Sequence, residues 1–305
     1  QVHKYGDKII KVKHKDLEKL MEIDLLILQS LIKHSKRLER RLGRLFSFLR
    51  LLEFDKFSNE LRDQTNLKKE ASYLKEMTDK LQDIPLLQLP KLYFSTEEIL
   101  IESFMGGKNI STFNNTTFQN KRKIEIIIIF LYMINNDIIH CDLHPGNILH
   151  TTNNINLIDF GLCYSLSPKE KFNIKELFKM LVQLRTNKLE LSESLAIDFI
   201  LLLYPQLKKS DINADPIMMM KIKTFLMQGQ LRATEQGMVL GDQNEAFSAL
   251  DVIRNRLIRN GWYMNYGISY VVITLILLEE SNIGLLYKDL ENTLKERNLV
   301  YLIEN

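Results

Sequence analysis

Three features that would mark a specialised class of protein are scarce in this 305-residue sequence. It has only two cysteines, Cys141 and Cys163, which fit a reducing compartment better than the disulfide framework of a secreted domain. The 41 basic residues are nearly balanced by 38 acidic ones, and the resulting net charge of +3 argues against nucleic acid as the main partner. Long apolar runs are missing too, since none reaches the roughly 18 residues of a membrane span.

The composition is otherwise that of an ordinary soluble protein. With 45% hydrophobic and 26% charged residues, the chain can bury a sizeable core as one large domain or two small ones. The most apolar stretches are 262–278, which Asn265 and Gly267 interrupt, and 124–134, which is too short to cross a bilayer. We predict that both are buried helices. Because the sequence begins with Gln1 rather than Met, we interpret it as a fragment or a processed chain whose targeting segment would lie upstream.

The most informative stretch runs from residue 140 to 162 and reads HCDLHPGNILHTTNNINLIDFGL. Asp142 and Asn147 have the spacing found in the catalytic loop of protein kinases, where the Asp accepts the hydroxyl proton and the Asn holds magnesium. Asp159 then begins a D-F-G sequence, whose Asp holds the magnesium that bridges the β- and γ-phosphates in kinases. The joint pattern predicts phosphoryl-transfer chemistry.

The local pattern around these three residues agrees with that chemistry. Apolar pairs flank the polar loop, and residues 155–158 predict a short strand that ends at the D-F-G aspartate. Asn153 and Asn154 would turn the hairpin before it, and Pro145 with Gly146 predicts a tight turn inside the loop. The two aspartates and the asparagine are therefore expected at strand ends or in loops, facing a common cleft.

The sequence H-x-D-x-H-P-G-N followed by D-F-G resembles the UbiB/ADCK family of atypical kinases, with aminoglycoside and choline phosphotransferases as near relatives. The resemblance covers residues 1 to about 165, and the rest fits only by being helical. It implies an α+β, protein-kinase-like bilobal fold. The small mixed N-lobe would comprise 1–103, with its start and its phosphate-binding loop missing. The mainly helical C-lobe would comprise 104–305, and ATP would bind between the lobes.

The resemblance also identifies candidate phosphate-binding residues in the small lobe. Q-V-H followed by G-D-K-I-I-K-V-K-H resembles the family's lysine-bearing strand, which makes Lys11 the candidate. Lys13 is the alternative, because residues two apart in a strand point to the same face. Glu70, in the sequence E-A, matches the family glutamate that pairs with this lysine. The family's acidic E-x-D motif is replaced here by two amides, in Gln64-Thr65-Asn66.

Two helices are expected beside these strands, at 16–52 and 54–81, from apolar residues that recur at three- and four-residue steps. The basic part of the first helix, 33–50, is interpreted as a solvated face, with contact to anionic lipid headgroups as the alternative.

Further along, short strands at 92–94 and 99–102 lead into residues 101–107, which resemble the connector between kinase lobes. The Glu102 C=O and the Phe104 N–H are candidates for binding an adenine ring there.

The remaining chain is predicted to be almost wholly helical. Ser167 followed by Pro168 is typical of a helix start, with Ser as the cap and Pro at the first position. The expected helices are 121–135, 168–187, 190–204, 215–235, 244–260, 262–281 and 286–300.

In the resembled family, the motif residues have defined roles. Asp142 would be the base that accepts a proton, while Asn147 and Asp159 would hold Mg²⁺. Lys11 and Glu70 would anchor the phosphates. His144 is the alternative proton acceptor, and both His140 and His144 would otherwise shape the loop by hydrogen bonding.

The resemblance implies an atypical kinase or ATPase with ATP and Mg²⁺ as cofactors, in support of ubiquinone or other isoprenoid-lipid metabolism. Its expected location is mitochondrial. Besides ATP, the expected partners are a membrane surface or an isoprenoid lipid, with no nucleic acid and no identified protein partner. Two alternatives stay open: a catalytically silent pseudokinase scaffold, and a small-molecule phosphotransferase of the aminoglycoside or choline type.

Overall fold

The chain has an α+β fold made of two compact units. The computed structural model describes residues 1–42, 58–59, 62–185, 192–229 and 287–304, with shorter pieces at 232–234, 237–239, 249, 252–253, 255–257, 260, 262, 264–265, 267–271 and 274. One unit combines Gln1–Lys108 with Asn147–Cys163, and the other combines Asn109–Gly146 with Tyr164–Asn305. The segment with Asn147 and Asp159 thus groups with the N-terminal part, and the lobe boundary predicted at residues 103 and 104 stays a prediction.

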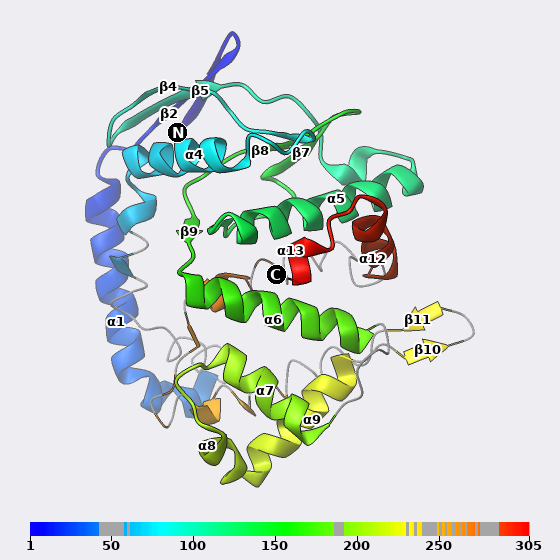
Figure 1. Cartoon of the computed structure of the whole chain (residues 1–305). Helices are drawn as coiled ribbons and strands as arrows, with labels where there is room; N and C mark the ends of the chain where they lie inside the picture. Colours follow the sequence, from blue (N-terminus) through cyan, green and yellow to red (C-terminus); the bar gives the residue numbers. More distant parts are fainter. Residues whose placement is uncertain are drawn as a thin grey trace. The chain divides into compact units, whose positions relative to one another are not determined.

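A four-stranded antiparallel sheet with strand order β1-β2-β5-β4 occupies the first unit (Figure 1). Gly6 turns the first hairpin with a φ of +61°, which glycine adopts without strain. Lys11 on β2 pairs with Leu100 on β5. The expected strands are therefore present. Their bounds are β1 (Val2–Tyr5), β2 (Lys8–Val12), β4 (Leu92–Ser95) and β5 (Ile99–Ser103).

A smaller sheet in the same unit carries the D-F-G segment at its edge. The predicted hairpin is confirmed: β7 (Ile148–His150) pairs with β8 (Ile155–Leu157), and the Thr151 N–H donates to the Asn154 C=O in its turn. The short strand β3 (Leu87–Gln88) pairs in parallel with β8 and was not expected. Two residues are too few for a periodic pattern to reveal a strand.

The first helix, α1 (Leu17–Leu42), begins one residue after the predicted start at residue 16. Its predicted end at residue 52 lies outside the described residues. The side chains of residues 32–42 of this helix lie outside the described residues as well. The basic face predicted at 33–50, with lipid contact as its alternative, falls in this part of the chain.

The second helix does not run unbroken from residue 54, contrary to the prediction. Among the described residues of this stretch, Thr65 is a turn and α4 (Leu67–Leu81) starts after Asn66. The Asn66 carboxamide oxygen accepts two N–H groups of the first turn, at 3.0 and 3.2 Å. Asn is among the best N-caps because its side chain replaces the hydrogen bonds that the first N–H groups lack. Asn66, in the sequence where the resemblance led us to expect a carboxylate, is thus a helix cap.

One face of α4 packs on the four-stranded sheet (Figure 1). Ala71, Leu74, Met77 and Leu81 recur at helical spacing on this face and are buried. Burying a large apolar side chain contributes about 1.5–3 kcal/mol, so this face holds the helix against β4 and β5. Glu70 is buried at the start of the helix, and its position is therefore fixed by the same packing.

In the second unit, α5 (Thr116–Asn135) is a core helix, as predicted. It starts before residue 121 because the Asn115 side chain caps it by accepting the Phe118 N–H. Most residues between 124 and 134 are buried, which confirms the buried-helix interpretation of this stretch. Across the described part of the chain, no helix combines the length and the apolar character that crossing a membrane requires.

The start of α6 (Pro168–Arg185) follows the predicted signals. The Ser167 hydroxyl accepts the Glu170 N–H at 3.3 Å, and the Glu170 carboxylate accepts the Ser167 N–H at 2.8 Å, which is a reciprocal capping box. The other elements of this unit before residue 230 are η1 (Ile110–Thr112), β6 (Ile138–His140), β9 (Cys163–Ser165, of which Tyr164 and Ser165 belong here), α7 (Glu193–Leu203), α8 (Lys209–Asn213) and α9 (Pro216–Gly229).

Two of the predicted C-terminal helices end earlier than expected. The helix predicted at 215–235 is described as α9 only to Gly229, and β10 (Arg232–Thr234) then pairs with β11 (Gly237–Val239). The helix predicted at 286–300 is α12 (Tyr287–Glu296). It ends in a Schellman motif around Asn298, whose φ is +55°.

A last short helix, α13 (Tyr301–Glu304), follows. The helices predicted at 244–260 and 262–281 lie largely outside the described residues.

Candidate functional site

The structure brings Lys11 and Glu70 together from positions 59 residues apart. The Lys11 Nζ lies 2.5 Å from the Glu70 Oε1, and both side chains are largely buried. The alternative lysine, Lys13, pairs instead with the exposed Glu18, also at 2.5 Å. Of these two lysines, the one that meets the helix glutamate is therefore Lys11, on β2.

Glu70 also holds the D-F-G segment. Its Oε1 accepts the N–H of the buried Phe160 at 3.3 Å, across 90 residues of sequence. Asp159 precedes it with a φ of +63°, in the left-handed region. This conformation leaves the Asp159 side chain 57% exposed, with its Oδ1 4.0 Å from the Lys11 Nζ and 3.3 Å from the Gly161 N. The lysine, the glutamate and the D-F-G aspartate thus form one cluster.

A third carboxylate joins this cluster from β5. The Glu102 Oε1 lies 3.4 Å from the Lys11 Nζ, the Glu102 side chain is buried, and its Oε2 has no hydrogen-bond partner among the described residues. Sequence reasoning considered only the backbone C=O of Glu102. The alternation of β5 carried the signal, because period two places Glu102 on the same buried face as Leu100.

The charges in the cluster act on each other. Burial lowers the pKa of Lys11, but the carboxylates of Glu70, Glu102 and Asp159 outweigh burial and raise this pKa above its ordinary value. The pKa of Glu102 is also raised, because burial disfavours its charged form and the nearby Glu70 repels it, while Lys11 opposes both effects. Lys11 is therefore held as a cation.

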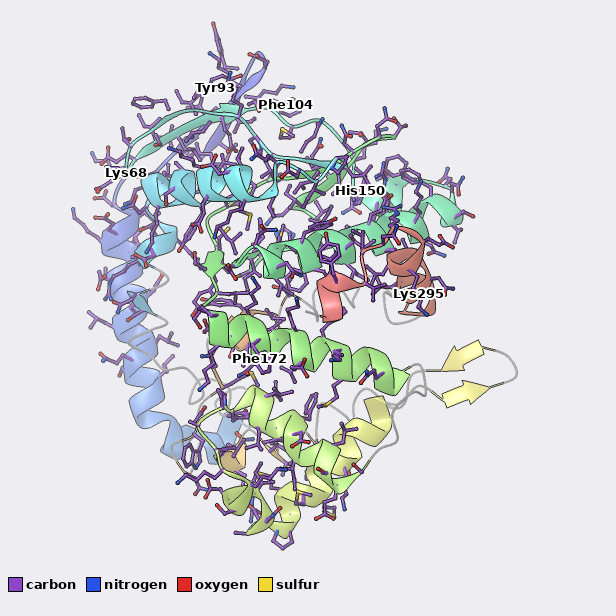
Figure 2. The ribbon with its side chains drawn as sticks, viewed as in Figure 1. Lys68, Tyr93, Phe104, His150, Phe172 and Lys295 are labelled. Carbon is purple, nitrogen blue, oxygen red and sulfur yellow. The ribbon has the colours of Figure 1, made fainter. Side chains whose placement is uncertain are left out.

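The backbone of Phe104 is already occupied in the structure. Its N–H donates to the Asp7 C=O at 2.7 Å, and its ring, labelled in Figure 2, has the Lys4 Nζ 3.5 Å from its centroid. An adenine could use this N–H only after the bond to Asp7 opened. The roles of the Phe104 N–H and the Glu102 C=O in nucleotide binding stay predictions.

The side-chain oxygens of Asn147 and Asp159 are suitable ligands for a magnesium ion. Both offer oxygen, and magnesium in phosphoryl-transfer sites is held by one or two carboxylates together with phosphates and water. Asn147 is buried, and its C=O accepts the Ile158 N–H at 3.1 Å, which ties it to the strand leading to Asp159. In the described ranges, no group of three or more His, Cys, Asp or Glu residues could hold a metal by itself, so an ion at Asn147 and Asp159 would also need phosphate or water ligands.

In the second unit, two histidines shape the loop around Asp142. The His140 Nδ1 accepts the Asp142 N–H at 3.2 Å, and the His144 Nδ1 accepts the Gly146 N–H at 3.0 Å. A neutral His144 therefore carries its proton on Nε2, the atom that lies 3.7 Å from the Asp142 Oδ2. A Cβ at Gly146 would come within 2.6 Å of the His144 ring, so a larger residue there would have to displace this ring. Both histidines thus make hydrogen bonds within the loop, and the catalytic role considered for His144 stays a prediction.

Both cysteines are buried, and neither forms a disulfide within the described part of the chain. Burial raises the pKa of the Cys163 thiol, and the carboxylates of Glu70 and Asp159 raise it further. A thiol that stays protonated is a poor nucleophile and metal ligand, so Cys163 behaves as a core residue.

Comparisons with known proteins agree with the motifs. Residues 1–192 match the family model described as the ABC1 atypical kinase-like domain. The chain is 24% identical over 207 residues to AarF domain-containing protein kinase 1 of Xenopus laevis, which covers 60% of this chain and 37% of that protein. It is 25% identical over 183 residues to the probable protein kinase UbiB of Aeromonas hydrophila subsp. hydrophila, covering 56% and 33% respectively. The chain thus spans roughly a third of the length of these relatives.

A solved structure, the complex of Rv3197 with erythromycin from Mycobacterium tuberculosis, covers 84% of this chain and 70% of that chain. The two are 16% identical, with a TM-score of 0.49. The family assignment rests on the family model, which matches more than half of the residues and includes every motif residue discussed above. The chain belongs to the ABC1 atypical kinase-like family, the UbiB/ADCK group of kinase-like proteins.

Proposed function

We propose that this chain binds MgATP and cleaves its terminal phosphate, as an atypical kinase or ATPase. The observation that carries the proposal is the contact of Glu70 with both the Lys11 Nζ and the Phe160 N–H. In protein kinases, a strand lysine paired with a helix glutamate and a D-F-G aspartate next to them must all be in position for phosphoryl transfer. The first unit has this arrangement within itself.

Lys11 would bind the phosphates of the nucleotide. Its raised pKa keeps the ammonium charged at any physiological pH. The hydrogen bond from the Lys11 Nζ to Glu70 limits the conformations that the lysine side chain can adopt. An ammonium that is positioned in advance loses little freedom when a phosphate binds, so it contributes more to affinity than a mobile surface lysine.

Asn147 and Asp159 would hold magnesium. The ion, when bound, would neutralise charge on the β- and γ-phosphates. Asp159 is suited to this role because its left-handed backbone leaves the carboxylate more than half exposed, although the neighbouring Phe160 is fully buried.

Asp142 would accept the proton of the attacking hydroxyl or water. Its carboxylate is partly exposed, and its backbone N–H is fixed by the buried His140. The His144 Nε2 lies 3.7 Å from the Asp142 Oδ2, which is too far for a direct hydrogen bond. We favour Asp142 over the alternative, His144, as proton acceptor, because the Gly146 N–H occupies the basic nitrogen of a neutral His144.

The resemblance to UbiB/ADCK proteins supports a finer proposal. The activity would serve ubiquinone or other isoprenoid-lipid metabolism, with a membrane surface or an isoprenoid lipid as partner, in the mitochondrion.

The proposal is tested by the thermal shift that MgATP produces in the wild-type protein and in Asp159→Asn. A ligand at a hundredfold excess over its Kd adds about 2.7 kcal/mol, which raises Tm by several degrees. We expect a magnesium-dependent shift in the wild type that is reduced in Asp159→Asn. The control Asp79→Asn makes the same change at an exposed position of α4 and should keep the full shift. No shift in the wild type would leave a non-binding scaffold as the better account.

A further inference from the structure

Lys11 has more acidic neighbours than a phosphate-binding lysine needs. Its Nζ lies 2.5 Å from Glu70, 3.4 Å from Glu102 and 4.0 Å from Asp159. One positive charge therefore faces three carboxylates. A phosphate that binds Lys11 adds further negative charge beside them, so the phosphate and the carboxylates would compete for the three N–H groups of one ammonium.

Two of the three carboxylates have other hydrogen bonds that hold them. Glu70 accepts the Phe160 N–H, and Asp159 accepts the Gly161 N–H while most of its side chain reaches solvent. Glu102 differs from both. Its side chain is 4% exposed, and its Oε2 has no hydrogen-bond partner within the described ranges. Its contact with Lys11 is therefore the interaction that compensates its charge.

Glu102 stands where an apolar residue would be expected. It belongs to the buried face of β5 together with Leu100, which is fully buried. A buried carboxylate is expensive unless it is paired and hydrogen-bonded, because water no longer solvates it. Burial accordingly raises the pKa of Glu102, and Lys11 is the group that opposes this effect. If Lys11 turned toward a phosphate, the Glu102 carboxylate would lose its counter-charge.

We propose that Glu102 competes with the phosphates of the bound nucleotide for Lys11, and so sets the affinity of the site below what the Lys11–Glu70 pair alone would give. The inference rests on the proposed function, since it takes a nucleoside di- or triphosphate as the ligand. Glu102 acts through Lys11 and is a positioning residue. Its effect falls on the phosphates, because the ammonium is the group that both anions require. Binding of the nucleoside part is left unchanged.

The experiment is a calorimetric titration of the wild-type protein and Glu102→Gln with the β,γ-imido analogue of MgATP, and separately with adenosine. Gln keeps the size of the side chain and removes its charge. We expect the Kd for the magnesium nucleotide to fall by about five- to tenfold in Glu102→Gln, and the response to adenosine to stay the same. Glu97→Gln makes the identical change at an exposed position of the β4–β5 hairpin and should match the wild type.

Each other result overturns the inference in a distinct way. Unchanged or weaker nucleotide binding by Glu102→Gln would show that the carboxylate does not compete for Lys11. An equal gain for adenosine would place the effect of Glu102 at the base. No nucleotide binding by the wild type would contradict the proposed function itself. If Glu102→Gln melts early, Glu102→Leu also removes the charge, suits a buried strand position and should show the same gain in nucleotide affinity.

Discussion

Glu70 Oε1 lies 2.5 Å from the Lys11 Nζ, and the same oxygen accepts the Phe160 N–H at 3.3 Å. One carboxylate oxygen on α4 thus connects β2 with the D-F-G segment. The connection is buried, so replacing Glu70 removes an ion pair and leaves a buried N–H without its acceptor.

This contact predicts the effect of Glu70→Ala on stability. Breaking a buried ion pair by removing one partner costs about 3–5 kcal/mol, and here Glu102 still partly compensates Lys11, so we expect a loss of about 2–4 kcal/mol. Glu76→Ala is the matched control, because Glu76 pairs with Lys80 on the same helix at 2.8 Å, with both side chains about a third exposed. It should cost less than about 1 kcal/mol. Denaturant unfolding measures both, and equal losses would contradict the structural role of Glu70.

Asn66 is predicted to matter for stability through its side-chain oxygen. Asn66→Ala should cost about 0.5–2 kcal/mol, because the first N–H groups of α4 lose their acceptor. Asn66→Asp keeps the acceptor and adds a negative charge at the helix start, so it should be neutral or stabilising. Gln64→Ala, two residues earlier and exposed, serves as the control. If Asn66→Asp destabilised the protein as much as Asn66→Ala, the capping account would be wrong.

Glu170 predicts a pH dependence of stability. Burial raises the pKa of its carboxyl, but hydrogen bonds from Ser167 and Tyr164 outweigh burial and hold this pKa below the ordinary value of 4.5. A lowered folded-state pKa means that the contribution is fully present above about pH 4.5 and is lost as the pH falls through the folded value. The wild type should therefore exceed Glu170→Gln in free energy of unfolding by about 1 kcal/mol at pH 6.

The difference between these two proteins should shrink below pH 4.5, which denaturant unfolding at a series of pH values would measure. If the difference in free energy of unfolding stayed constant down to pH 3, the charge of the Glu170 carboxylate would contribute nothing to stability.

Much of the candidate site follows from sequence, because its motifs are local. The strand before Asp159, the hairpin turned at Asn154 and the cap at Ser167 depend on residues within a few positions of each other. Lys11 and Glu70 were also paired correctly, but through a family resemblance, since nothing local in the sequence connects residues 59 apart.

The parts that escaped prediction depend on tertiary contacts or on single residues that override a periodic pattern. The break before α4 follows from one hydrogen-bonding side chain, Asn66, inside a helical pattern. The two residues of β3 form a strand because they pair with β8, which is far from them in the sequence. The side chain of Glu102 was overlooked because a charged residue in a strand ordinarily faces solvent. Only its position on the buried face, beside Lys11, makes it part of the site.

The most direct test of the proposed nucleotide site compares Lys11, on β2, with Lys13, which directly follows that strand. Lys11→Met and Lys13→Met make the same change two residues apart. Lys11 belongs to the cluster with Glu70, whereas Lys13 pairs with Glu18. We would measure the Kd of MgATP for both variants and the wild type by calorimetric titration. The account predicts at least about a tenfold loss of affinity in Lys11→Met and wild-type affinity in Lys13→Met. Equal affinities in all three proteins would contradict it.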